Sequence, residues 1–338
     1  MISKRMLFPG SSPSSLQGNR WRYLIALLVI GALLVVMPGF LPSYLLDLLT
    51  KVLILSVFAV SLNIIWDAGL TSLGHATYFG WGAYVSAILI ARLGIGNFWV
   101  ILGTAIVSVT VLSAIFGIIA LRVSGVYFMM VTMALSQLVY FTSIALVSIT
   151  GGINGIYGIS LPNLGFIQLA SNKTLFYFLV LFISAVCFFL MHKLHYSTFG
   201  YAMRGIRSDE TKMKTLGYNT WLMKYVGFIV SAVFAAVAGV LFSYFLGLVC
   251  PPQVDIKTAT MAILMLIVGG SSIFFGPVLG AILFVLLEYF ASIYLPTRWP
   301  LVLGLVFIFS VMFLRGGIAV YFIELWKDRI RRNESDSM

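Results

Sequence analysis

The dominant feature of this 338-residue sequence is a succession of long apolar runs separated by short polar segments. A helix that crosses a lipid bilayer needs about 20 mainly apolar residues, and most of the runs approach that length. We therefore predict an all-α fold, a polytopic membrane bundle of about ten spanning helices. The expected spans are Trp21–Met37, Tyr44–Trp66, Leu73–Ala91, Phe98–Leu121, Val123–Ile149, Thr174–Met191, Tyr225–Val249, Thr258–Ser271, Phe274–Tyr294 and Trp299–Leu314.

The composition excludes a water-soluble protein. Apolar residues make up 61% of the chain and charged residues only 9%, whereas a soluble protein carries about 25% charged residues. The net charge of +11 suggests nucleic-acid binding, but the basic residues lie between apolar runs and do not form one basic surface with aromatic residues. We therefore expect membrane lipids, and no nucleic acid, around this chain.

The distribution of basic residues predicts the orientation, because Lys and Arg accumulate in cytoplasmic loops. A cytoplasmic N-terminus and ten crossings place about sixteen of the basic residues inside, and the opposite orientation places them outside. Both termini are therefore expected in the cytoplasm. The expected regions are a cytoplasmic N-terminal segment at 1–20, a transmembrane domain at 21–318 with a cytoplasmic loop at 192–224, and a cytoplasmic tail at 319–338. We expect Trp21–Met37 to be a retained anchor, because it is long and has no small-residue cleavage site.

Sequence motifs of common enzyme active sites are absent. The chain has no G-x-x-x-x-G-K-[ST] phosphate loop, no H-E-x-x-H zinc motif and no G-x-S-x-G nucleophile motif. Cys187 and Cys250 have no metal-ligand spacing, and His192 and His195 are expected to be neutral residues at the membrane surface. We expect a non-catalytic subunit without cofactor or metal, whose energy comes from an ion gradient or from an ATP-hydrolysing partner.

Two acidic residues decide whether an ion gradient is plausible, because a gradient-driven carrier needs ionisable groups inside the membrane. Asp67 follows the second expected span, and we expect it to be a cap that contacts water or a helix N-terminus. Glu288 lies within the ninth span. It is either the acid of a carrier or a structural hydrogen-bonding residue, and one acid gives little support for a carrier.

Two glycine-rich segments, Asp67–Tyr84 and Val268–Ala281, interrupt the apolar pattern. Paired Gly and Pro breaks in the two halves of a transporter indicate its transport pathway, but small residues equally allow close helix packing. Both interpretations stay open, and His75 is either beside the pathway or packed and hydrogen-bonded. The candidate pathway residues in these segments are Gly69, Ser72, Gly74, His75, Gly80, Gly269, Gly270, Gly276 and Pro277.

A third glycine cluster, Thr150–Gly158, is expected on the outer side of the membrane. Consecutive glycines form backbone nests that bind anionic groups, and they equally form plain turns. Gly151, Gly152 and Asn154 therefore complete the candidate pathway residues.

The longest internal polar stretch, His192–Lys224, is expected in the cytoplasm. Ser208, Asp209 and Glu210 have the pattern of a helix start, and Gly217 that of a helix stop. A short charged helix between two spans suits docking onto another protein, and an ordinary interfacial helix explains the same pattern.

Taken together, these segments resemble the permease subunits of ATP-binding-cassette importers for branched-chain amino acids, in particular those of LivM type. The family's S-L-G-H-A and F-F-G-x-G-A-Y motifs are similar to Ser72–Ala76 and Tyr78–Tyr84, and its T-G-G-x-x-G-I is matched by Thr150–Ile156. Its cytoplasmic loop resembles Gly200–Asn219, and its later glycine-rich motif resembles Gly269–Ala281. The resemblance runs from about Leu45 to Ile318, with Lys212 and Met213 standing where the family usually has alanines.

The resemblance implies a subunit of the bacterial inner membrane that pairs with a second, LivH-like permease. Two cytoplasmic ATP-binding subunits and a periplasmic solute-binding protein are the other implied partners. Under this interpretation Arg204–Gly217 forms a coupling helix that docks into an ATPase. Its candidate coupling residues are Arg204, Arg207, Asp209, Glu210, Leu216 and Gly217.

The implied substrates are leucine, isoleucine and valine, which Ser72 and backbone amides of the glycine-rich breaks are expected to bind through the carboxylate. Similar permeases carry urea, short amides and other small polar solutes, so these remain alternatives. A gradient-driven carrier that uses Glu288 and a membrane scaffold without transport are the rival hypotheses.

Overall fold

The computed structural model of the chain describes residues 42–163 and 173–294 continuously, and single residues at 35, 38, 298, 301, 304, 305, 308, 309, 312, 317, 318 and 321. The chain divides into two compact units, residues 1–46 and 47–338. The described residues of the first unit include 42–46, where helix α2 begins. The second unit holds all the contacts considered below.

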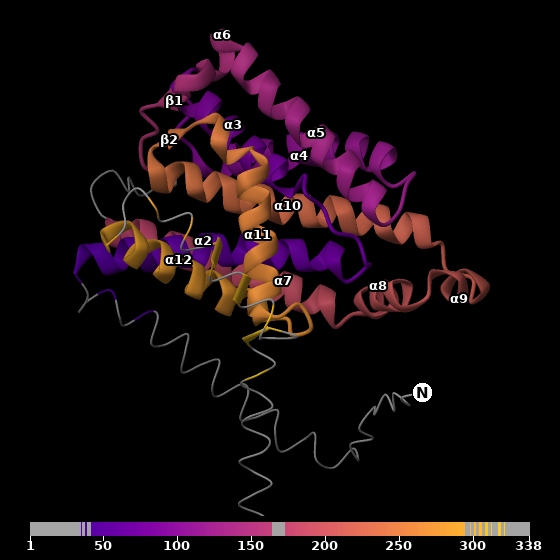
Figure 1. Cartoon of the computed structure of the whole chain (residues 1–338). Coiled ribbons are helices and arrows are strands. Elements are labelled where there is room, and N and C mark those ends of the chain that lie inside the picture. The colour runs from indigo at the N-terminus through magenta and orange to yellow at the C-terminus, as the bar shows by residue number, and fades with distance from the viewer. Residues whose placement is uncertain are drawn as a thin grey trace, which may run out of the picture. The chain divides into compact units, whose positions relative to one another are not determined.

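Helices account for most of the described residues (Figure 1). The long helices are α2 (Ser43–Trp66), α3 (His75–Ala91), α4 (Phe98–Ala120), α5 (Val126–Ala145), α7 (Lys173–His195), α10 (Thr220–Leu246), α11 (Ile256–Gly269) and α12 (Gly276–Tyr294). The short elements are α6 (Val147–Thr150), η2 (Gly152–Asn154), β1 (Ile156–Tyr157), α8 (Thr198–Ser208), α9 (Glu210–Thr215), β2 (Leu248–Val249) and η3 (Pro251–Gln253).

The centre of the second unit is the pair α3 and α10, and α10 also packs against α4. Helices α3 and α10 touch through their backbones. A side chain on Gly82 would collide with Ala236, and one on Gly239 would collide with the carbonyl of Phe79. Small residues permit such approach inside a membrane, where van der Waals packing replaces the hydrophobic effect as the main attraction between helices.

Helices α11 and α12 form a second close pair. Gly269, Gly276 and Gly280 face one another at their crossing, where any side chain would strike backbone atoms. The glycine-rich break between the two helices is therefore also a packing site.

The ends of α10 carry different structures (Figure 1). Before its first residue lie α8 and α9, and after its last residue lies β2. Strand β2 pairs antiparallel with β1, with Ile156 opposite Val249 and Tyr157 opposite Leu248.

The all-α polytopic prediction is confirmed for the described residues. Eight of the expected spans coincide with long helices, and seven described helices are long and apolar enough to cross a membrane. Helix α3 misses that criterion because it has only 17 residues. The expected spans Trp21–Met37 and Trp299–Leu314 lie outside the continuously described residues, so the total of ten stays a prediction.

The expected span Val123–Ile149 is wrong as one helix. Helix α5 ends at Ala145, and Leu146 leaves the helical conformation before α6 begins. The short expected span Thr258–Ser271 is a regular helix, α11, and η3 lengthens it at its N-terminal side to Pro251–Gly269.

Candidate functional site

Helices α8 and α9 connect α7 to α10 and form the candidate coupling element. Ser197 begins α8, where its side-chain oxygen accepts a hydrogen bond from the Gly200 amide. Asp209 then adopts an extended backbone, and its carboxylate accepts a hydrogen bond from the Lys212 amide at 3.1 Å and so begins α9. The expectation of one helix over Arg204–Gly217 is therefore wrong, because capping at Asp209 divides it. The predicted helix start at 208–210 is confirmed.

The two helices differ in what they bury. Helix α8 is amphipathic, and its Ala202, Met203 and Ile206 are buried. Helix α9 buries none of its residues. Beyond it, Leu216 is 71% exposed, and Gly217 has the positive φ of a helix stop. We call α8 and α9 together the hairpin. Its inner helix, α8, packs against the bundle, and its outer helix, α9, is open to solvent.

The carboxylate of Glu210 forms ion pairs and a hydrogen bond with other residues of this chain. It pairs with Lys224 and with Lys214, the latter at 3.1 Å, and accepts a hydrogen bond from Thr220 at 3.0 Å. Partial burial raises the pKa of Glu210, but the hydrogen bonds from Lys224 and Lys214 outweigh this effect and lower the pKa to about 2. Glu210 therefore anchors α9 to the start of α10.

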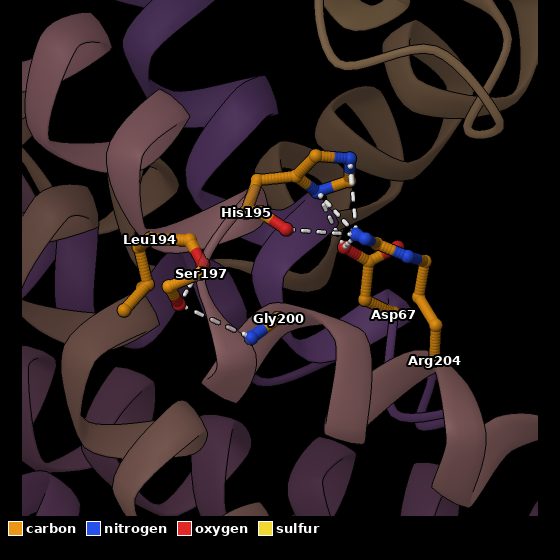
Figure 2. Close-up of polar contacts among 6 residues, drawn as sticks. All are labelled: Asp67, Leu194, His195, Ser197, Gly200 and Arg204. Atoms are coloured by element: carbon orange, nitrogen blue, oxygen red, sulfur yellow. Dashed lines mark hydrogen bonds and ion pairs between the residues drawn. The ribbon is translucent and has the colours of Figure 1, made fainter. Parts of the chain in front are cut away.

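Asp67, His195 and Arg204 form a polar cluster at the base of the hairpin (Figure 2). The Asp67 carboxylate lies 2.7 Å from His195 Nδ1 and 3.6 Å from Arg204 Nη1. Arg204 Nη1 also donates to the backbone oxygen of His195 at 3.0 Å. The expectation that Asp67 is a cap in contact with water or a helix N-terminus is wrong, because its side chain is 7% exposed and contacts His195 at the end of α7 and Arg204 within α8.

Other contacts join α8 to the glycine-rich segment Asp67–Tyr84, which we call the first break; Val268–Ala281 is the second break. The guanidinium of Arg207 lies 5.5 Å from the ring of Trp66, and its aliphatic part packs against Gly69. Gly69 has φ of +77°, which a side chain would strain, so the chain turns here directly beneath α8. Of the predicted coupling residues, Arg204 and Arg207 thus face the bundle.

The other residues of the first break are packed inside the bundle. His75 is 2% exposed, lies 2.8 Å from Ser61 Oγ through Nε2, and stacks on Phe58. The position of His75 favours the packed, hydrogen-bonded interpretation. Gly74 and Gly80 face Thr132 and Val254 without room for a side chain.

Several buried polar side chains in or beside this break have no hydrogen-bond partner within the described residues. Among them are Ser72, through its hydroxyl oxygen, and Asn63, through both atoms of its amide. Asn63 lines a small cavity together with Asp67, His195, Met203 and Phe274. Polar atoms buried without a partner are rare in proteins, so these two positions are candidates for contacts with a solute or with water.

The second break meets the first at His195. Phe274, between α11 and α12, lies 5.5 Å from the ring of His195 and 5.3 Å from that of His192. Gly270 has φ of +105°, and Gly276 and Pro277 begin α12 as buried residues. Two predicted pathway segments are therefore close together at this end of the bundle.

The third glycine cluster does not join them. Gly151 and Gly152 both have positive φ and form the turn between α6 and η2, in which Thr150 Oγ1 bonds the carbonyl of Ser143 and the amide of Gly152. Asn154 is exposed at the end of this turn. The cluster follows the end of α5, whereas Gly74 of the first break contacts Thr132 nearer the start of α5.

Glu288 is not a lone acid. Both of its carboxylate oxygens lie 2.9 Å from Nζ of Lys51 on α2, and each side chain is about a quarter exposed. This confirms the structural interpretation of Glu288. Among the described residues, no group of three or more His, Cys, Asp or Glu side chains is placed to bind a metal ion.

Sequence reasoning missed the partners of these charged residues. It identified Asp67 and Glu288 as unusual but not His195, Arg204 or Lys51 as the groups that neutralise them. The available signal was the rarity of charge itself, since an isolated acid in an apolar chain requires a cation elsewhere.

Comparison with known proteins gives a consistent result. The sequence model of the family described as "Branched-chain amino acid transport system / permease component" matches residues 44–314. The LivM permease protein of the high-affinity branched-chain amino acid transport system of Escherichia coli K12 is 28% identical over 78% of this chain and 66% of its own length, just under two thirds. The LivH permease protein of the same strain is 24% identical over 72% of this chain and 83% of its own length. A probable LivM of Methanocaldococcus jannaschii is 27% identical over 42% of each chain. No solved structure matches.

Proposed function

This chain belongs to the family of branched-chain amino acid transport permease components, and we propose that it is a transmembrane permease subunit of an ATP-binding-cassette importer. The single observation that carries the proposal is the family match over residues 44–314. The seven described helices with the length and apolarity of membrane spans support it.

The proposed substrates are leucine, isoleucine and valine, because the matched LivM and LivH proteins are named for branched-chain amino acid transport. Urea, short amides or another small polar solute is the alternative. The unpartnered hydroxyl of Ser72 and the unpartnered amide of Asn63 supply polar contacts for an amino acid or an amide.

The proposed pathway uses Ser72 and the glycine-rich segments, with Gly69, Gly74 and Gly80 from the first break and Gly269, Gly270, Gly276 and Pro277 from the second. His75 stands beside it as a packed residue. Gly151, Gly152 and Asn154 belong to its opposite end, where a solute would enter.

The proposed assembly contains a second permease of LivH type, two ATP-binding subunits and a periplasmic solute-binding protein in the bacterial inner membrane. The similarity of this chain to both LivM and LivH supports two related permeases in one complex. The excess of basic residues on the α8–α9 side supports a cytoplasmic position for the hairpin and for both termini.

The hairpin is the proposed docking element for an ATP-binding subunit. Helix α9 buries none of its residues, and Lys212, Lys214 and Leu216 are exposed. Asp209 and Glu210 act within the hairpin, as the cap of α9 and as its anchor. Closure of the ATPases on ATP would push the hairpin and rock the spans behind it.

The test is reconstitution into liposomes of this chain with the companion permease, the ATPases and the binding protein, followed by uptake of radiolabelled leucine. We expect uptake only with ATP and with the full assembly. Uptake driven by an ion gradient in the isolated chain would overturn the proposal in favour of a carrier, and ATP-dependent uptake of urea or an amide instead would replace the substrate.

Leu216→Asp tests the docking surface. We expect it to reduce ATPase retention on the affinity-purified permease at least tenfold, because it places a charge in the proposed interface. Leu93→Asp is the matched control, since Leu93 is 63% exposed in the loop after α3 at the other end of the bundle. Equal retention by both variants would contradict docking through α9.

A further inference from the structure

The Asp67 carboxylate is held by residues from two other elements. Asp67 directly follows α2, His195 is the last residue of α7, and Arg204 lies in the middle of α8. The side chains of Asp67 and His195 are only 7% and 11% exposed. A charge buried to this extent is stable only while its partners remain in contact.

The three side chains contact one another. His195 Nδ1 lies 2.7 Å from the Asp67 carboxylate, and Arg204 Nη1 lies 3.2 Å from Nδ1 and 3.1 Å from Nε2 of the same ring. Arg204 also donates to the carbonyl oxygen of His195. Each of the three residues therefore contacts the other two (Figure 2).

The cluster lies where both glycine-rich breaks reach the hairpin. Asp67 begins the first break, and Phe274 of the second break packs on the ring of His195. One helical turn before Asp67, the unpartnered amide of Asn63 lines the cavity that Asp67, His195 and Phe274 share. Displacement at this point therefore reaches both breaks and the end of α2.

We propose that Asp67, His195 and Arg204 form a joint that transmits displacement of α8 to the two glycine-rich breaks. They act as positioning residues for transport and do not bind the solute. The proposal rests on the proposed function, because it needs a partner that pushes the hairpin. Since separation of α8 from Asp67 would leave a buried charge without its partner, α8 and the first break move together.

The experiment measures leucine uptake per ATP hydrolysed in the reconstituted assembly. For Asp67→Asn we expect a fall of at least tenfold in this ratio while ATP hydrolysis stays within about threefold of the wild type, because the side-chain shape remains but the charge that holds Arg204 is lost. Glu288→Gln, the matched amide substitution in the other charged contact of α2, is expected to leave the ratio unchanged.

A second readout does not depend on transport. In a background with Cys187 and Cys250 replaced by Ser, a Ser72→Cys substitution reports access to the first break through its rate of reaction with a membrane-impermeant thiol reagent. We expect ATP to change this rate at least threefold when Asp67 is present and not in the Asp67→Asn variant.

The outcomes separate the two proposals. A wild-type assembly without ATP-dependent uptake of any tested solute would overturn the proposed function. A functional wild type together with an unaltered ratio in Asp67→Asn, or an equal fall of uptake and hydrolysis, would overturn the joint alone, since a purely structural residue affects both. An ATP response of the thiol that survives Asp67→Asn would also overturn it.

Discussion

Two charged contacts involve α2 and the residue that follows it, and they differ in what they connect. Lys51 and Glu288 join α2 to α12, with both side chains about a quarter exposed. Asp67, sixteen residues further along, joins the end of α2 to α7 and α8 and is almost fully buried. One contact ties two neighbouring spans, whereas the other ties spans to a hairpin outside them.

This difference in burial indicates which of the two charged contacts is coupled to transport. A partly exposed pair is free to rearrange when neighbouring helices shift, because its members reach lipid headgroups or water by extending their side chains. The Asp67 carboxylate, which is 7% exposed, has no such alternative, so its separation from His195 and Arg204 carries a large electrostatic cost. The contact with Lys51 also gives Glu288, the main residue of the rival carrier hypothesis, a structural role.

Asp67→Ala should have the largest effect on stability. It leaves the His195 side chain, which is 11% exposed, without the carboxylate that it contacts, and a buried polar group without its partner costs about 1–3 kcal/mol. The measurement is the thermal unfolding midpoint of the purified protein in detergent. A decrease no greater than that of Glu288→Ala would contradict the difference in burial.

Glu288→Gln should have a smaller effect. After this substitution Lys51 has no acidic partner, but it lies only about 12 Å from the first residue of α2, so its side chain can extend toward water or lipid headgroups at that end. We therefore expect the free energy of unfolding to fall by only about 1 kcal/mol. ATP-dependent uptake should persist. Abolished uptake with intact assembly would instead support Glu288 as the acid of a carrier.

Glu210 should show the smallest effect and a distinctive dependence on pH. Its pKa is lowered from 4.5 to about 2 in the folded protein, so the stability that its charge contributes is present above about pH 4.5 and is lost as the pH falls toward 2. The difference in unfolding midpoint between the wild type and Glu210→Gln should be constant from pH 7 to pH 5 and shrink below pH 4. A difference that already disappears at pH 5 would contradict the anchoring role.

The sequence was sufficient to predict features that depend on local pattern. Apolar runs predicted the spans because a bilayer imposes their length, and the acids at 209 and 210 with Gly217 predicted the limits of α9 because capping involves neighbouring residues. The same reasoning failed at Arg204–Gly217, where Asp209 as a cap requires α8 to end before α9 begins.

The candidate joint was beyond prediction for a physical reason. Asp67 lies 128 positions before His195 and 137 positions before Arg204 in the sequence, and no periodic pattern links the three residues. Glycine-rich segments were recognised, but their sequence is the same for a pathway and for close packing. The structure distinguishes Gly82 and Gly239, which pack backbone on backbone, from Ser72, whose hydroxyl is left without a partner.

The most direct measurement is a pair of double-mutant cycles on leucine uptake per ATP hydrolysed. One cycle combines Asp67→Asn with Arg204→Gln, and the other combines Asp67→Asn with Glu288→Gln. We predict that the first pair is strongly non-additive, with the double variant no worse than Asp67→Asn alone. We predict that the second pair is additive, because Lys51, the partner of Glu288, lies about 24 Å along the helix axis from Asp67. Additive effects in both cycles would contradict the claim that Asp67 and Arg204 act as one joint.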